Sequence, residues 1–176
     1  DFIHENVSKN WARSYQGVQF KKGELLKSEI SNSNPAGMQG YVFNIRKKKF
    51  TDVRVRKAIS LAMDFEWMNR QLFYDQYVRS NSFFTNTEMA AYGRATKKET
   101  ELLFKLAQKN NLSLDDSLLG PVPIPPSTSN PKSLRENLKE AVRLLNQAGW
   151  YVKDGKLLDT KGKPFEFEVL LDTRGW

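Results

Sequence analysis

Apolar residues recur at helical spacing in several stretches of the chain. The clearest stretch follows Asp52, where residues at i, i+3, i+4, i+7 and i+8 are apolar: Val55, Ala58, Ile59, Ala62 and Met63. Asp52 is a favourable N-cap, so we predict a helix between Asp52 and Asp64. Similar spacing predicts a short helix within residues 6–15 and another that begins after Asp64 and runs to about Tyr74.

Two capping boxes mark the start of two longer helices. Thr96 is followed three residues later by Glu99, and Ser133 by Glu136, so each pair can satisfy amides at a helix N-terminus. Apolar positions behind them predict helices that end near Asn110 and at Gly149, where a left-handed residue is suited to stop the second.

Strands are predicted where apolar residues alternate with period 2. Residues 41–45 show this pattern, residues 165–171 repeat it with two Phe residues, and residues 24–30 form a shorter candidate. Asp154-Gly155 between two apolar runs favours a type I′ hairpin. The fold class predicted from these elements is α/β, a mixed sheet with packed helices.

Between these elements lie segments rich in polar or turn-forming residues. Residues 31–37 and 77–84 have no regular period. Residues 120–131 contain most of the prolines of the chain, which argues against a helix or an inner strand. We expect an ordered extended connection there, with Val122 and Ile124 packed onto the protein; a proline-rich ligand for another domain is the alternative.

Composition fits a globular chain of 176 residues, one domain or a sizeable part of a larger one. The absence of Cys excludes disulfides, Cys-bound zinc and thiol nucleophiles. The net charge of +8 favours a solvated basic face and leaves open nucleic acid, a membrane surface or an acidic ligand. The densest basic run, residues 46–49, suits an exposed connection.

Catalytic chemistry has little support in the sequence. His4 is the one histidine, and the chain lacks phosphate-loop, dinucleotide, nucleophile-elbow and zinc-helix motifs. Two facing carboxylates for glycan hydrolysis stay an alternative, although Asp52 and Asp64 are better explained as helix caps. Arg54 and Arg56 are interpreted as structural. We therefore predict no enzyme activity, metal or cofactor.

Two blocks of the sequence resemble the signature region of family 5 extracellular solute-binding proteins, the peptide- and nickel-binding components of ABC importers. The first block is Tyr41-Val42-Phe43-Asn44-Ile45 followed by Phe50-Thr51-Asp52-Val53-Arg54-Val55-Arg56-Lys57-Ala58-Ile59-Ser60-Leu61-Ala62-Met63-Asp64. The second joins residues 141–150, which end in Ala-Gly-Trp, to Asp154-Gly155 and residues 165–171. Residues 65–69 and 79–84 look closest to the Yej-type branch, which is associated with oligopeptides and microcin C-like conjugates.

The resemblance implies a type II periplasmic-binding-protein fold, of which residues 1–176 would be a single fragment of the C-terminal lobe. It also implies a substrate-binding component of an ABC importer, periplasmic or tethered outside the cytoplasm. Its partners would be an oligopeptide or peptide-like ligand, permease subunits and the first lobe of the parent protein, without nucleic acid or direct membrane insertion. A basic nucleic-acid-binding or regulatory module is the alternative.

Residues 79–84 are the predicted ligand-contacting loop, because they combine one cation, polar groups and two aromatic rings. The ligand-binding candidates are Arg79, Asn81, Ser82, Phe83 and Phe84. In the alternative interpretation, this is a surface loop whose two Phe rings pack into the core.

Overall fold

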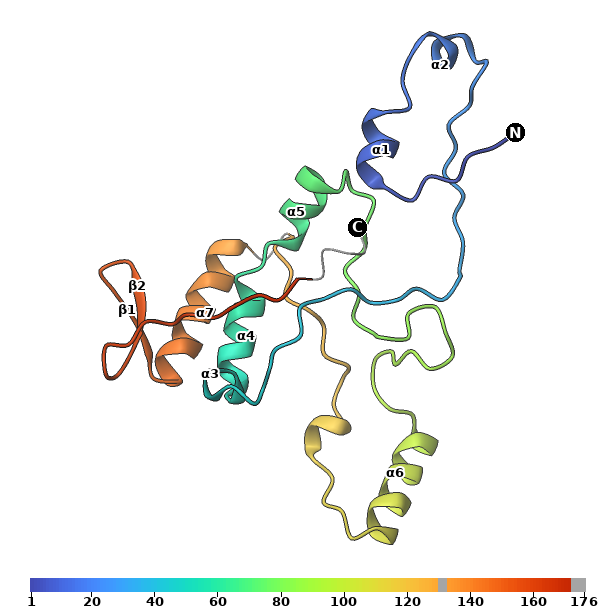
Figure 1. Cartoon of the computed structure of the whole chain (residues 1–176). Coiled ribbons are helices and arrows are strands. Elements are labelled where there is room, and N and C mark those ends of the chain that lie inside the picture. The colour runs from blue at the N-terminus through green and yellow to red at the C-terminus, as the bar shows by residue number, and fades with distance from the viewer. Residues whose placement is uncertain (130–132, 172–176) are drawn as a thin grey trace. The chain divides into compact units, whose positions relative to one another are not determined.

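The computed structural model describes residues 1–129 and 133–171, and its backbone divides into two compact units. Unit 1 contains Asp1–Tyr41 and Met68–Pro125, and unit 2 contains Val42–Trp67 together with the rest of the chain from Pro126. The last division, at Pro125 and Pro126, falls inside the predicted proline-rich connection of residues 120–131, whose last two residues lie outside the described part. Figure 1 shows the order of the elements along the chain.

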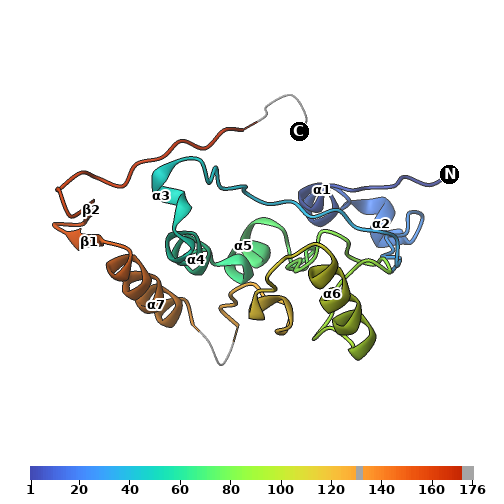
Figure 2. The same cartoon turned by 90° about the horizontal axis from the view of Figure 1, so that it is seen from below.

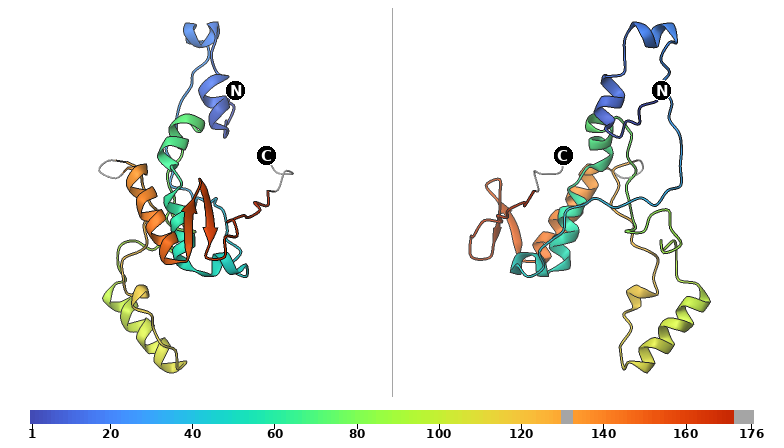
Figure 3. Two further views of the ribbon diagram at one scale, coloured as in Figure 1. Left: turned by 90° about the vertical axis from the view of Figure 1, so that its left-hand side faces the viewer. Right: turned by 45° about the vertical axis from the view of Figure 1, so that its right-hand side comes forward.

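The core of unit 2 is a pair of helices. α4 (Val53–Leu61) packs along α7 (Leu134–Gln147), as two views show (Figures 1 and 3). Val55 and Ala58 on α4 are 0% and 1% exposed, and Ala141 on α7 is 4% exposed. The small side chains let the two helices approach closely, and the predicted helix after Asp52 is confirmed.

Both helices of this pair begin at the predicted caps. The Asp52 carboxylate accepts a hydrogen bond of 2.8 Å from the Arg54 amide. The Ser133 hydroxyl accepts one of 3.3 Å from the Glu136 amide, and Glu136 in turn accepts one of 3.0 Å from the Ser133 amide. These bonds satisfy amide groups that have no partner inside the helix.

A two-stranded antiparallel hairpin follows α7. β1 (Trp150–Lys153) pairs with β2 (Lys156–Asp159), with Lys153 opposite Lys156. Asp154 and Gly155 have φ of 50° and 72°, the left-handed backbone that a type I′ turn requires. Gly149, at φ 83°, ends α7 in the predicted left-handed conformation. The hairpin prediction is confirmed.

A cluster of aromatic rings surrounds Phe50, which is 7% exposed. Phe50 lies at the end of α3 (Lys48–Thr51), a single helical turn formed by part of the basic run that we expected to be an exposed connection. Its ring centroid is 5.3 Å from that of Phe43, 6.2 Å from Phe165 and 5.7 Å from Phe167. Residues near the start and near the end of unit 2 in the sequence therefore pack around the Phe50 ring.

Two predicted strands, which lie in unit 2 except for Tyr41, are not strands in the structure. Residues 41–45 and 165–171 are extended or irregular and join no sheet in the described part of the chain. Pairing ends where the Phe165 amide donates to the Leu157 carbonyl, and the chain beyond continues as a single trace (Figure 2). An alternating segment becomes a strand only when a second strand accepts its backbone hydrogen bonds, and Leu170 is 98% exposed.

Unit 1 consists of short helices joined by long connections. α1 (Ser8–Arg13) and α6 (Lys97–Lys109) confirm two predicted helices, and α6 begins with the capping box of Thr96 and Glu99. α5 (Phe65–Leu72), which confirms the helix predicted after Asp64, runs across the division between the units. A 3₁₀ turn (Asp116–Leu118) lies in the connection after α6.

Two predictions for unit 1 are wrong. Residues 24–30 form no strand; the regular element nearby is α2 (Val18–Lys22), which ends at Gly23 in a left-handed conformation. Glycine adopts this conformation without a steric penalty, so it stops the helix where we expected only a break in a β-like region. Ile124, expected to pack down, is 82% exposed, whereas Val122 is half-buried and its amide donates to the Gly93 carbonyl over 2.7 Å.

Candidate functional site

The candidate ligand-contacting residues lie in a loop of unit 1 that pairs with a second, distant loop. We call residues 31–41 and 79–92 the paired loops. The Ala36 amide donates a hydrogen bond of 3.1 Å to the Thr85 carbonyl, which forms an isolated antiparallel bridge. The Asn86 side-chain amide donates one of 3.1 Å to the Asn34 carbonyl. Two segments about fifty residues apart thus form one surface.

Hydroxyl groups hold the second loop in a defined shape. The Ser80 hydroxyl donates to the Ser82 carbonyl over 2.9 Å and shares a 3.1 Å hydrogen bond with the Thr85 hydroxyl. The Ser82 hydroxyl accepts from the Phe84 amide over 3.0 Å, and the Thr87 hydroxyl donates to the Phe84 carbonyl over 2.8 Å. Ordered loops of this kind need no helix or strand, because short polar side chains satisfy their backbone groups.

The aromatic rings of this loop point away from its polar interior. Phe83 is 73% exposed and Phe84 is 47% exposed, while Ser80, Ser82 and Thr85 are half-buried. Among the residues that the structure describes, the two rings are therefore not packed into a core. The usual arrangement of apolar residues inside and polar residues outside is inverted here.

The remaining predicted candidates differ in exposure. Arg79 is half-buried at the start of the loop, and Asn81 is exposed next to Ser82. The five candidates are consecutive or nearly so in sequence, so their proximity follows from the chain itself. The structure adds their neighbour across the bridge, residues 31–41, of which the sequence predicted 31–37 as a loop and Tyr41 as part of a strand.

A second polar cluster lies in unit 2, at the start of α5. The Glu66 carboxylate accepts hydrogen bonds from the Ser127 hydroxyl at 2.5 Å, the Thr128 amide at 3.1 Å and the Thr128 hydroxyl at 2.9 Å. The same Thr128 hydroxyl lies 2.5 Å from Asp64, whose carboxylate also accepts the Trp67 amide at 3.0 Å. The prediction that Asp64 caps α5 is therefore confirmed.

The electrostatics of Glu66 reflect these contacts. Partial burial raises the pKa of its carboxyl group, but the hydrogen bonds from Ser127 and Thr128 outweigh burial and lower the pKa to about 2. Asn137 on α7, 6% exposed, donates to the Ser127 carbonyl over 2.9 Å. The cluster links the later part of the proline-rich connection, Ser127 and Thr128, to two helices, and this is a structural role.

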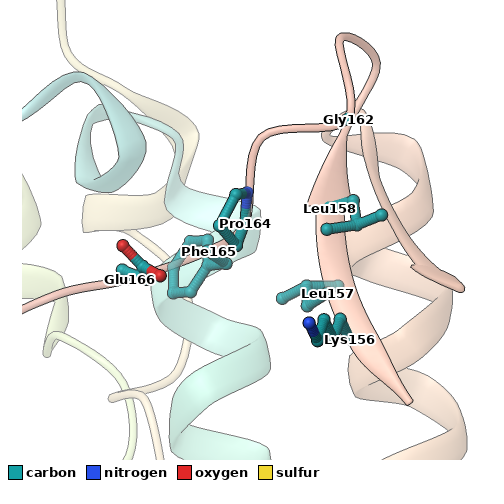
Figure 4. Close-up of a pocket in the computed structure, with 7 residues that line it drawn as sticks. All are labelled: Lys156, Leu157, Leu158, Gly162, Pro164, Phe165 and Glu166. Carbon is teal, nitrogen blue, oxygen red and sulfur yellow. The ribbon is translucent and has the colours of Figure 1, made fainter. Parts of the chain in front are cut away.

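A shallow pocket of about 560 Å³ opens beside the hairpin in unit 2 (Figure 4). Leu157 and Leu158 of β2 form one side, and Pro164, Phe165 and Glu166 of the following segment lie across from them. Lys156, Gly162 and Glu166 complete the lining, which is mixed in polarity. Because residues 163–165 already pair with β2, this pocket is best explained as the inner face of a partly formed sheet.

Arg54 and Arg56 make local contacts. The Arg54 guanidinium lies 2.6 Å from the Asp52 carboxylate, whose pKa it lowers together with the Arg54 amide. The Arg56 Nη1 donates to the carbonyls of Phe50 and Thr51 over 2.6 and 2.9 Å. Both side chains therefore stabilise the turn between α3 and α4.

In residues 1–129 and 133–171, no three His, Asp or Glu side chains are grouped so that they could hold a metal ion. His4 is exposed near the N-terminus. Across the same ranges, every helix is too short or too polar to cross a membrane.

Comparison with known proteins places almost the whole chain in one family. Residues 10–175 match the family described as bacterial extracellular solute-binding proteins, family 5 Middle. A protein of Escherichia coli K12 called uncharacterized protein YejA is 40% identical over 172 residues, which is 97% of this chain and 28% of that protein.

Two proteins of Agrobacterium fabrum show further similarity. The "Probable peptide-binding protein YejA" is 33% identical over 99% of this chain and 28% of its own length. The "Peptidoglycan-binding protein YepA" is also 33% identical, over 92% of this chain and 26% of its own length. The chain therefore spans about a quarter of the length of the curated relatives that it matches.

Proposed function

Because the chain belongs to family 5 of the bacterial extracellular solute-binding proteins, we propose that it forms part of the substrate-binding component of an ABC importer. The component captures oligopeptides or peptide-like compounds outside the cytoplasm and delivers them to permease subunits. The observation that carries the proposal is the family match over residues 10–175. The similarity to the Agrobacterium fabrum protein called "Probable peptide-binding protein YejA" supports peptides as the ligand class.

In this proposal the chain contributes one surface of the binding site and the rest of the protein, including a first lobe, contributes the other. The ligand is held between the two lobes of a type II periplasmic-binding-protein fold, and higher affinity for the closed form shifts the population toward it. Residues 1–176 belong to the C-terminal lobe. Transport itself needs no catalytic residue in this chain.

The proposed contact surface is the loop of Arg79, Asn81, Ser82, Phe83 and Phe84. Its exposed rings offer apolar contact, and its amide and hydroxyl groups suit a peptide backbone. Peptides of varied sequence are bound chiefly through groups that all peptides share, and exposed rings tolerate many side chains.

The test is to purify a full-length protein that carries this chain under native conditions and to identify bound compounds by mass spectrometry. We expect masses of peptides or peptide-like molecules, and a rise in thermal midpoint when a peptide library is added to the ligand-free protein. No such mass and no thermal shift would contradict the proposal. Binding to DNA that weakens steeply with salt would instead favour the nucleic-acid alternative suggested by the +8 charge.

A further inference from the structure

The paired loops differ from the rest of the chain in charge. Charged residues make up 27% of the sequence. Residues 31–41 contain none, and residues 79–92 contain two, Glu88 and the half-buried Arg79. These are two separate stretches of sequence, and the Ala36–Thr85 bridge joins them into one surface. In a basic protein of net charge +8, the paired loops thus hold few charged residues, one of each sign.

Exposed apolar side chains belong to both loops. On the second loop Phe83, Phe84, Met89 and Tyr92 are 73%, 47%, 70% and 66% exposed, and on the first loop Met38 is 37% exposed. Aromatic and Met side chains supply much of the contact energy at binding surfaces, because they offer a large area, and Met adapts its shape.

The polar side chains of the paired loops differ in their hydrogen bonding and exposure. The hydroxyls of Ser80, Ser82 and Thr87 make hydrogen bonds inside the second loop. Gln39 and Asn81 are exposed amides on the first and second loop. An amide side chain offers one acceptor and two donors without charge, which matches a peptide bond.

We propose that the paired loops form a subsite that selects a neutral, apolar stretch of the bound peptide, with Met38, Phe83 and Phe84 contacting its side chains and Gln39 and Asn81 facing its backbone. This rests on the proposed function, peptide capture, and adds the class of peptide. A charged side chain placed on this surface loses water and meets few charges, because the two loops hold only Glu88 and the half-buried Arg79 at the start of the second loop, so its binding is disfavoured.

The test compares three pentapeptides that differ at one position: Ala-Ala-Phe-Ala-Ala, Ala-Ala-Glu-Ala-Ala and Ala-Ala-Lys-Ala-Ala. They are titrated by calorimetry into a ligand-free, full-length protein that carries this chain. We expect the Phe peptide to bind at least tenfold more tightly than either charged peptide. Equal affinity for all three overturns the neutral subsite while leaving peptide capture intact, whereas no binding of any peptide contradicts the proposed function itself.

Two variants localise the effect. Phe83→Glu is expected to lower the affinity for the Phe peptide at least tenfold. It should also raise the affinity for the Lys peptide relative to that for the Phe peptide. Phe104→Glu is the matched control, because Phe104 is 52% exposed on α6, outside the paired loops, and is expected to leave all three affinities within twofold. Equal effects of the two variants would overturn the proposal.

Phe83→Ser is a milder variant that replaces Phe83→Glu in the test if the latter impairs folding. It is expected to lower the affinity for the Phe peptide three- to tenfold. Size-exclusion chromatography of the same samples distinguishes another occupant. A change of oligomeric state on Phe83 substitution without a change in peptide affinity would show that a second copy covers this surface, and would overturn the proposal.

Discussion

The helix pair of unit 2 and the paired loops of unit 1 each join segments far apart in the chain, but they do so by opposite means. α4 and α7 meet through apolar contact, with Val55, Ala58 and Ala141 almost fully buried. The paired loops meet through backbone and amide hydrogen bonds, and they leave their rings exposed. The first contact stabilises the protein without a ligand, whereas the second leaves apolar area that a ligand can cover.

The comparison predicts where substitutions affect stability most. In a full-length protein that carries this chain, Val55→Asp is expected to lower the free energy of unfolding by at least about 3 kcal/mol, because an unpaired carboxylate is placed between α4 and α7. Denaturant unfolding followed by circular dichroism measures the loss. Val53→Asp, on the same helix at a residue 48% exposed, is the control and should change stability by less than about 0.5 kcal/mol. Similar losses for both would contradict the buried contact.

The sequence predicted the individual helices well, although not which of them pack together, because the signals for a helix are local. A helix is specified by residues within four positions of one another and by a cap, and Asp52, Thr96 and Ser133 provide the caps that we predicted. Gly149 and Asp154-Gly155 likewise act through their own backbone conformation.

Strands and loop pairing were harder to predict because they depend on distant partners. Residues 165–171 alternate as a strand does. Alternation shows which residues share a face, but it does not identify the second strand that must pair with them. The bridge between Ala36 and Thr85 uses backbone groups, which every residue carries, so residue identity gave no signal. Of the candidate site, the aromatic residues of the second loop were found from the sequence and the contribution of the first loop was not.

The Glu66 cluster extends the comparison to polar contacts made by a half-buried carboxylate. Glu66→Gln should cost roughly 1–2 kcal/mol at pH 7, since hydrogen bonds to a charged acceptor are stronger than those to a neutral one. The pKa of Glu66 is lowered from 4.5 to about 2, so this stability is fully present above pH 4.5 and is lost as the pH falls toward 2. Thermal unfolding of both proteins between pH 7 and pH 3 measures it.

The difference between wild type and Glu66→Gln should therefore shrink as the solution becomes more acidic. Asn137→Leu is a useful companion, because it removes the neutral hydrogen bond to the Ser127 carbonyl and its effect should not depend on pH in this range. A difference for Glu66→Gln that stays constant down to pH 3 would contradict the role of the charge.

The two capping boxes allow the two units to be compared directly, because one helix in each unit begins with the same type of capping hydrogen bonds. Ser133→Ala and Thr96→Ala each remove a cap worth about 1 kcal/mol. The first should lower the stability of unit 2 as a whole, since α7 carries Ala141 and Asn137 of its core. The second should raise hydrogen exchange mainly within α6, where Ala107 is the buried residue. Equal spread of exchange in both variants would show that α6 is as well packed as α7.

The smallest effect on stability is expected at the paired loops, where the largest effect on binding is expected. Phe83→Ser should change the free energy of unfolding by less than about 0.5 kcal/mol, because a ring that is 73% exposed loses little burial when it is removed. Denaturant unfolding of the ligand-free, full-length protein measures this. A loss above about 2 kcal/mol would mean that the ring is buried against another part of the protein, since truncation of a buried Phe costs that much or more. A near-zero change in the free energy of unfolding of the ligand-free protein, together with weaker peptide binding, would show that the Phe83 ring contacts a ligand and does not stabilise the fold.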